Sequence, residues 1–408
     1  MNFRSVKPSQ GDYFMILIVC LLIAVGLTAI FSASYHVESA TLKSNFTKQI
    51  VWFVISFVLM IVAIVLPLRL INSVTYWLYA LSIVALIMTL FSSRIADVHR
   101  WIVIGPIQIQ PAEFVKIGVL LTLAKYLSEE RRDLSNLRDI GFAFGIILIP
   151  FALVVKQPDL GTALVFVSLI LPMLFWAGLP FYLFFSMIAP FLSLISAFNY
   201  YSFLVAMILI AGVLLFMKRG PRYFLFNMLM NIGVGLITPL LWGKLHTYQQ
   251  HRILTFLGLK IDPHGASYQV IQSIVAIGSG GFFGKGFLNG TQTQLRFLPA
   301  QHTDFIFSVI GEEAGFIGVL FILALFYIIL LRGIFIAFVC HNRFGSLLSI
   351  GIVTIIGFHV LVTISMTVGI MPVTGIPLPF ISYGGSSLMA NMILIGLLIN
   401  ASIRRYKY

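Results

Sequence analysis

One aspartate stands where a polar loop runs into an apolar, helix-forming stretch. Asp304 lies in FLPAQHTDFIFSVIGEEAGFIG, residues 297–318, directly after His302 and Thr303. Thr and Asp both suit the first turn of a helix, where free backbone N–H groups and the helix dipole favour their oxygens. A carboxylate at a membrane boundary more often marks a site, and one within ~3 Å of a hydroxyl can act as a general base. Asp304 is therefore the catalytic candidate, with a helix cap as the alternative.

Three more segments place polar groups between apolar runs. They are HRWIVIGPIQIQPAEFVK (99–116), KQPDLGTA (156–163) and MPVTGIPLPFISYGGSS (371–387). Glu113 and Lys116 lie three apart on one predicted helix face, where they can form a structural ion pair or part of a cationic wall. Pro158 and Gly161 also explain the second segment as a simple turn. His302 is a candidate binding residue, with a hydrogen-bonding surface histidine as the alternative. The other candidate binding residues are Arg100, Glu113, Lys116, Lys156, Asp159, Ser382 and Tyr383.

The composition is that of a polytopic membrane protein of the all-α class. Of 408 residues, 60% are hydrophobic and 10% are charged, whereas soluble domains carry about 25% charged residues. Apolar runs near ~20 residues are long enough to cross a bilayer as helices, and their continuity excludes the alternating pattern of a barrel. The twelve predicted helices lie near 13–33, 49–67, 75–92, 111–127, 141–156, 161–178, 181–198, 201–217, 223–243, 305–338, 345–369 and 384–402.

The net charge of +13 follows the expected membrane topology. If the N-terminus is cytoplasmic, Lys and Arg gather in the loops that then lie inside, as the positive-inside rule requires. The charge therefore gives no reason to expect nucleic acid, and the C-terminus is predicted to be cytoplasmic. The distant Cys20 and Cys340 indicate neither a disulfide framework nor a zinc site. The inside residues are Arg69, Arg131, Arg132, Arg138, Lys218, Arg219, Arg222, Arg343, Arg404, Arg405 and Lys407.

The chain is predicted to form a single membrane domain, 1–408, with one large extracytoplasmic loop at 244–304. This loop is rich in Gly, Phe, Ile and Leu, so we expect it to fold against the membrane surface. Its glycine-rich stretch GSGGFFGKG, 278–286, does not match the phosphate-loop pattern, because Ser279 stands where the first Gly belongs. Tight turns explain the glycines better than a nucleotide does.

The polar segments, taken in order along the chain, resemble the SEDS family (shape, elongation, division and sporulation), whose members include RodA, FtsW and SpoVE. Within that family GKGFLNGTQTQLRFLP is most similar to the elongation-type, RodA sequences. The segments that carry the resemblance are WIVIGPIQIQPAEFVKI, KQPDLGTALV, YQQHRI, GASYQVIQSIVAIGSGGFFGKG, FLPAQHTDFIFSVIGEEAGFIG and MPVTGIPLPFISYGGSS.

The resemblance implies a peptidoglycan glycosyltransferase of the bacterial inner membrane, with its active site outside. Such an enzyme joins lipid II disaccharides into a lipid-linked β-1,4 glycan strand beside a class B penicillin-binding protein, which crosslinks the strands. The essential loop aspartate of the family corresponds to Asp304. A single base without a protein nucleophile predicts inversion, and cations would stabilise the departing diphosphate. No cofactor is required, although Mg²⁺ or Mn²⁺ at the diphosphate is compatible with this chemistry.

Two departures from the family pattern and two rival functions stay open. Ala112 replaces a Ser that is common in the family. Three apolar segments occupy 180–243 where the family has one, so we predict a ten-helix core with an inserted hairpin at 181–217. Charged residues in a helical bundle also line translocation paths, so the rivals are a lipid II flippase and a scaffold for the penicillin-binding protein.

Overall fold

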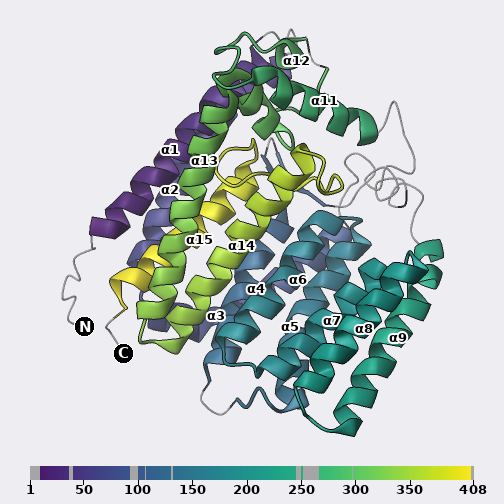
Figure 1. Ribbon diagram of the computed structural model, residues 1–408. Coiled ribbons are helices and arrows are strands. Elements are labelled where there is room, and N and C mark those ends of the chain that lie inside the picture. Colours follow the sequence, from purple (N-terminus) through teal and green to yellow (C-terminus); the bar gives the residue numbers. More distant parts are fainter. Residues whose placement is uncertain are drawn as a thin grey trace.

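The computed structural model describes residues 10–35, 40–91, 100–105, 107–129, 132–244, 250, 266–295 and 297–405. Long helices run side by side through most of the molecule (Figure 1). The predicted all-α membrane class is therefore confirmed. Much of the predicted loop at 244–304, namely 245–249, 251–265 and 296, lies outside the described residues.

Each of the twelve predicted apolar segments overlaps one long helix. Within the described residues, eight helices are long and apolar enough to cross a membrane, namely α1, α2, α3, α5, α9, α13, α14 and α15, whereas α6, α7 and α8 are shorter. That all twelve cross stays a prediction. The long helices are α1 Gln10–Ser34, α2 Ala40–Val65, α3 Leu68–Leu90, α4 Pro111–Ser128, α5 Leu137–Lys156, α6 Leu160–Trp176, α7 Phe181–Ser196, α8 Tyr200–Phe216, α9 Pro221–Lys244, α13 Ile306–Val339, α14 Arg343–Thr367 and α15 Gly385–Ile403.

Polar residues set several helix starts. Asn136, Asp159, Asn199 and Asn342 are N-cap residues whose side chains accept hydrogen bonds from backbone N–H groups of the first turn, which satisfies donors that a helix leaves free. Pro111 occupies the first position of α4, where its missing N–H costs nothing. The shorter elements are α11 Ala266–Gly280, α12 Thr291–Gln294 and an antiparallel hairpin of β1 Ile102–Ile104 and β2 Ile107–Ile109.

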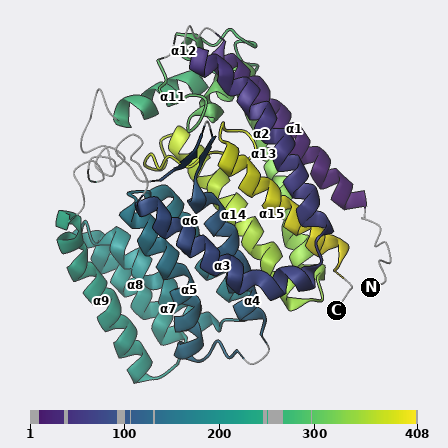
Figure 2. The ribbon, with the colours of Figure 1, turned by 180° about the vertical axis from the view of Figure 1, so that it is seen from behind.

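The core forms around α4, α14 and α15, which are buried along most of their length. Helix α15 packs on α2, α13 packs on α14, and α3 lies across the back of α4 (Figure 2). Small residues permit this packing: a Cβ on Gly396 would lie 2.6 Å from the carbonyl oxygen of Met60. Asn400 Nδ2 donates to Ala63 O at 2.7 Å. Close backbones and interhelical polar bonds are what hold helices together in lipid.

Helices α7, α8 and α9 form a unit at one side of the molecule (Figure 1). They contact one another more than they contact the remaining helices and share a small apolar core of their own. A buried hydrogen bond of 2.7 Å joins Ser193 on α7 to Asn231 on α9. Residues 181–217 thus include a helical hairpin, and its status as an insertion stays a prediction.

The glycine-rich stretch docks on α13 through its backbone. Helix α13 breaks at Gly315, with φ 64° and ψ −161°. At this break Lys285 N donates to Glu312 O at 3.0 Å and Phe316 N donates to Gly281 O at 2.9 Å. A Cβ on Gly284 would lie 2.1 Å from the carbonyl oxygen of Glu313. The glycines make tight turns, and they also allow a backbone contact that no side chain could share.

Replacing Gly315 with alanine tests this contact. The new Cβ would lie 2.2 Å from the backbone nitrogen of Gly284, at a positive φ that L-residues avoid. We expect Gly315→Ala to reduce the free energy of unfolding by at least about 1–3 kcal/mol, measured as a lower thermal midpoint in detergent. Gly212→Ala is the matched control, because nothing lies within 4 Å of its Cβ. Equal midpoints for the two variants would contradict the close backbone contact.

Candidate functional site

The four polar segments meet at one end of the helical bundle. Gln110, between β2 and α4, contacts two of the other segments: its Nε2 donates to Asp159 Oδ2 at 3.2 Å and its backbone N donates to Ser386 Oγ at 3.0 Å. Ser382 Oγ donates to Thr303 O at 2.7 Å, which joins the last segment to the loop before α13. The structure therefore brings together residues that are separated by hundreds of positions in the sequence.

Asp304 directly follows Thr303, whose carbonyl oxygen accepts from Ser382, and is partly exposed. Helix α13 has Phe305 as its N-cap residue and no acidic residue in its first turn, so Asp304 precedes the cap and the helix-cap alternative is not supported. A Cβ on Gly375 would lie 3.6 Å from Asp304 Oδ2. The carboxylate thus faces the segment between α14 and α15, residues 368–384, called here the 368–384 segment.

Ser382 and Tyr383 attach the 368–384 segment to the loop of Asp304. The Ser382 hydroxyl is buried and is used within the protein, because it also accepts from Leu378 N at 2.9 Å. Tyr383 N donates to His302 O at 3.0 Å, and the two rings lie 5.8 Å apart. Burial lowers the pKa of the His302 imidazole and raises the pKa of the Tyr383 phenol. Both rings are therefore neutral at pH 7.

Arg100 and Lys156 are the more accessible of the predicted cations. Arg100 Nε donates to Gln157 O at 3.0 Å, its Nη2 donates to Pro158 O, and its Nη1 lies 3.9 Å from Asp159 Oδ2. Asp159 is 6% exposed and caps α6 through Thr162. Lys156 is the last residue of α5 and is exposed. The second segment is thus a turn and also a place where two cations approach the surface.

Lys116 forms the predicted ion pair with Glu113, and both are almost fully buried. Lys116 Nζ lies 2.8 Å from Glu113 Oε2, with 1% and 3% of the two residues exposed. On its other side the ammonium lies 3.2 Å from Nε2 of His359, a residue of α14. Sequence reasoning missed His359, whose only signal was a single histidine in an otherwise apolar run. Lys116 does not reach the surface in this conformation.

Glu312 and Glu313 lie about two turns below Asp304 in α13, and both are buried. Glu312 is 0% exposed and accepts from Lys285 Nζ at 2.9 Å, Gln292 N at 2.9 Å and Thr293 N at 3.0 Å. Its carboxylate therefore holds the start of α12 and the end of the glycine-rich stretch against α13.

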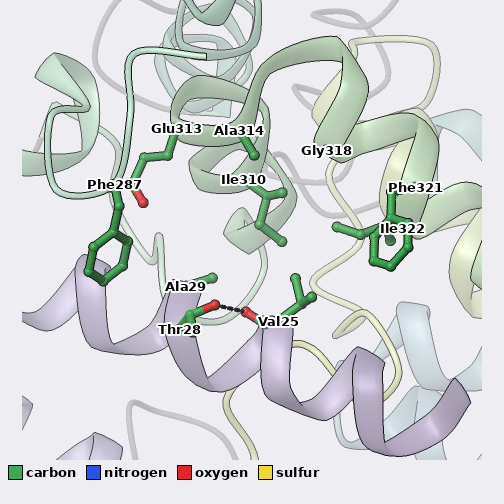
Figure 3. A pocket seen from close by; sticks show the side chains of 10 residues that line it. All are labelled: Val25, Thr28, Ala29, Phe287, Ile310, Glu313, Ala314, Gly318, Phe321 and Ile322. Atoms are coloured by element: carbon green, nitrogen blue, oxygen red, sulfur yellow. Dashed lines mark hydrogen bonds between the residues drawn. The ribbon is translucent and has the colours of Figure 1, made fainter. Parts of the chain in front are cut away.

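A cavity of about 300 Å³ lies between α1 and α13 beside Glu313. Figure 3 shows Glu313 and Phe287 at one side of it, opposite Thr28 and Ala29 of α1. Glu313 also accepts a short hydrogen bond from Ser32 Oγ of α1. The residues that line the cavity are mostly apolar. The Glu313 carboxylate thus connects α13 to α1 beside an apolar space.

No three His, Cys, Asp or Glu side chains gather as metal ligands within the described ranges. Asp304 and Asp159 are carboxylates of the site, and their oxygens are the kind of ligand that a hard cation prefers. Any divalent ion would therefore need most of its ligands from a substrate diphosphate and water.

The chain is similar to known proteins over almost its whole length. The family model for cell cycle proteins of the FtsW, RodA and SpoVE type matches residues 12–206 and 191–407. The peptidoglycan glycosyltransferase RodA of Treponema pallidum (strain Nichols) is 35% identical, over 99% of this chain and 100% of its own length. The peptidoglycan glycosyltransferase MrdB of Escherichia coli (strain K12) is 34% identical, over 97% and 94%. A chain from a solved peptidoglycan synthase complex is 30% identical, covers 97% of this chain and 98% of its own, and has a TM-score of 0.72.

Replacing Glu312 with alanine tests its role in the site. The substitution removes a charged acceptor from several donors, and one hydrogen bond to a charged group contributes about 1.5–3 kcal/mol. We expect Glu312→Ala to lower the thermal midpoint in detergent and to raise amide hydrogen exchange over residues 280–295. Glu129→Ala is the control, because its ion pair with Arg132 is partly exposed and such surface pairs contribute only about 0–1 kcal/mol. Wild-type exchange over 280–295 in Glu312→Ala would show that its carboxylate does not hold this loop.

Proposed function

Because the chain belongs to the FtsW/RodA/SpoVE (SEDS) family of cell cycle proteins, we propose that it is a RodA-type peptidoglycan glycosyltransferase. It joins lipid II disaccharides into β-1,4 glycan strands during rod-shape elongation. The chain is a multi-span membrane protein of a bacterial family of cell wall synthesis. We place it in the inner membrane, with both termini in the cytoplasm and Asp304 outside, on the positive-inside distribution of Lys and Arg.

The observation that carries the catalytic proposal is the position of the Asp304 carboxylate. It is partly exposed where four polar segments meet, outside the first turn of α13 and beside the 368–384 segment. A carboxylate here can take the proton from the C4 hydroxyl of one disaccharide as that oxygen attacks the anomeric carbon of another. The bond from that carbon to the lipid diphosphate breaks, and the diphosphate leaves with the electron pair. Attack from the opposite side inverts an α-linked donor into a β-linked product.

Cations of the neighbouring polar segments can stabilise the departing diphosphate. Arg100 and Lys156 lie near the surface of the site and can bind phosphate oxygens. Asp159 orients Arg100. Lys116 and Glu113 form a buried ion pair without net charge, which supports the site from below. His302 and Tyr383, neutral at pH 7, offer hydrogen bonds to sugar hydroxyls, while Ser382 holds the loop of Asp304 in place. The proposed reaction needs no cofactor.

The proposed partners are a class B penicillin-binding protein and the membrane that holds the polyprenyl tails. The similarity to a chain from a complex that coordinates polymerization and crosslinking supports such a partner. The described part of the extracytoplasmic loop 244–304, from Ala266 onward, is anchored by Glu312 and by the break at Gly315. This loop would lie on the outer side of the membrane, where the sugars of lipid II and the penicillin-binding protein are also proposed to lie.

Replacing Asp304 with asparagine tests the catalytic proposal. The amide cannot accept the hydroxyl proton, so we expect purified Asp304→Asn, supplied with lipid II, to lose polymerisation by about 100-fold or more without a change in thermal midpoint. Asp133→Asn is the control, an exposed aspartate beyond the far end of α4, about 27 Å along that helix from the site. An unchanged polymer yield from Asp304→Asn would remove it as the base.

Two further assays with the wild-type protein and Asp304→Asn distinguish the enzyme from the two rival functions. Movement of lipid II across vesicle membranes by wild-type protein, without polymer, would favour the flippase. A scaffold predicts that Asp304→Asn restores growth fully to a strain that lacks the wild-type protein. The enzyme predicts polymer from the wild-type protein alone and no restoration by Asp304→Asn.

The helices at 181–217 are proposed to be an insertion into a ten-helix core. Support comes from the family model, which matches in two stretches that overlap at 191–206, inside α7 and α8. With two added spans, the turn at Asn199 lies outside and the turn at Pro221 lies inside. We expect a cysteine at Asn199 to react with an impermeant maleimide from the periplasm and one at Pro221 to react only from the cytoplasm. The reverse labelling pattern would refute this topology.

A further inference from the structure

A buried chain of polar contacts runs beneath the proposed active site and passes through His359. This histidine lies in α14 and is 1% exposed. Its Nε2 lies 3.2 Å from Lys116 Nζ, and its Nδ1 lies 3.3 Å from Pro377 O. Lys116 in turn contacts Glu113 Oε2 at 2.8 Å. One imidazole therefore joins the ion pair on α4 to the backbone of the 368–384 segment.

The partners of His359 determine the role of each ring nitrogen. An ammonium group only donates hydrogen bonds, so Nε2 must accept from Lys116. A carbonyl oxygen only accepts, so the hydrogen on Nδ1 must be donated to Pro377 O. A neutral imidazole protonated at Nδ1 satisfies both contacts. A side chain without one acceptor and one donor cannot bridge these two groups.

Pro377 lies two residues after Gly375, the glycine that faces the Asp304 carboxylate. Two further hydrogen bonds hold the 368–384 segment, one to α14 and one to the loop before α13. Thr363 Oγ1, one turn along α14 from His359, donates to Ile376 O at 2.9 Å, and Ser382 Oγ donates to Thr303 O. The 368–384 segment is thus fixed both to the loop of Asp304 and to α14. His359 connects this segment to the charged ammonium group of Lys116.

We propose that His359 is a positioning residue, which sets the direction of the Lys116 ammonium and the distance between the 368–384 segment and Asp304. This inference rests on the proposed function of Asp304. His359 does not itself contact substrate in this arrangement, because it is buried beneath the 368–384 segment. It keeps Asp304 and Lys116 at fixed positions relative to each other while the diphosphate leaves. A misplacement of about 1 Å in such a site can cost about 100-fold in rate.

Two substitutions test the bridge. His359→Leu removes both hydrogen bonds, whereas His359→Gln keeps one acceptor and one donor at a similar reach. We expect the leucine variant to lose kcat by about tenfold or more with little change in KM, and the glutamine variant to keep about a third of kcat or better. Amide exchange over 368–384 should rise in His359→Leu and stay close to wild type in His359→Gln. If the leucine variant does not fold, His359→Asn replaces it, because the shorter amide reaches Pro377 O but not Lys116.

The control is Thr354→Val, on the same helix, whose hydroxyl donates to Ile350 O in its own turn. It should leave kcat, KM and exchange unchanged. Wild-type kcat in His359→Leu, or equal losses in the leucine and glutamine variants with unchanged exchange, would overturn the proposal. Exchange over 368–384 does not depend on turnover. A protein that makes no polymer at all would refute the proposed function, while the exchange data would still decide whether His359 holds the segment.

Discussion

The structure depends on one constraint: a charge removed from water must find its partner inside the chain. Burying an isolated ion is far more costly than any single contact can offset, whereas a hydrogen-bonded pair is tolerated. Lys116 meets Glu113 and His359, Glu312 meets Lys285 and two backbone N–H groups, and Asp159 meets Gln110. The pair of Lys116 and Glu113 lies within α4, whereas each of the other contacts joins different elements of the chain. The same contacts that neutralise these charges therefore assemble the site.

Exposure divides the polar residues of the site into two groups. Glu113, Lys116 and Glu312 are almost completely covered, so their contacts fix the positions of helices and loops. Asp304 is partly exposed and Lys156 is exposed at the end of the bundle, as the proposed reaction requires. A rigid charged layer beneath an accessible one is the preorganisation that electrostatic catalysis requires, because the supporting groups need not reorient during the reaction.

The helices and the four polar segments could be predicted because their signals are local. Apolar runs of membrane length, Pro111 at a helix start and the spacing of Glu113 and Lys116 are all visible in short windows of sequence. His359, Gln110 and Glu312 could not be assigned their roles, because their partners lie up to hundreds of residues away and no pattern names them. Asp304 was placed correctly at the start of α13, but only the backbone conformation shows that Phe305, rather than Asp304, is the cap.

The glycine-rich stretch shows how one local feature can have a global reason. Glycines at 280, 284 and 315 allow two backbones to approach more closely than any Cβ permits, and four backbone hydrogen bonds then join the stretch to the break in α13. The nine residues of α13 before that break carry Glu312 and Glu313 and begin directly after Phe305. Fixing the break therefore fixes the direction of the short helix that leads to Asp304. The glycines of the stretch therefore help to position Asp304, which lies eleven residues before Gly315 in the sequence.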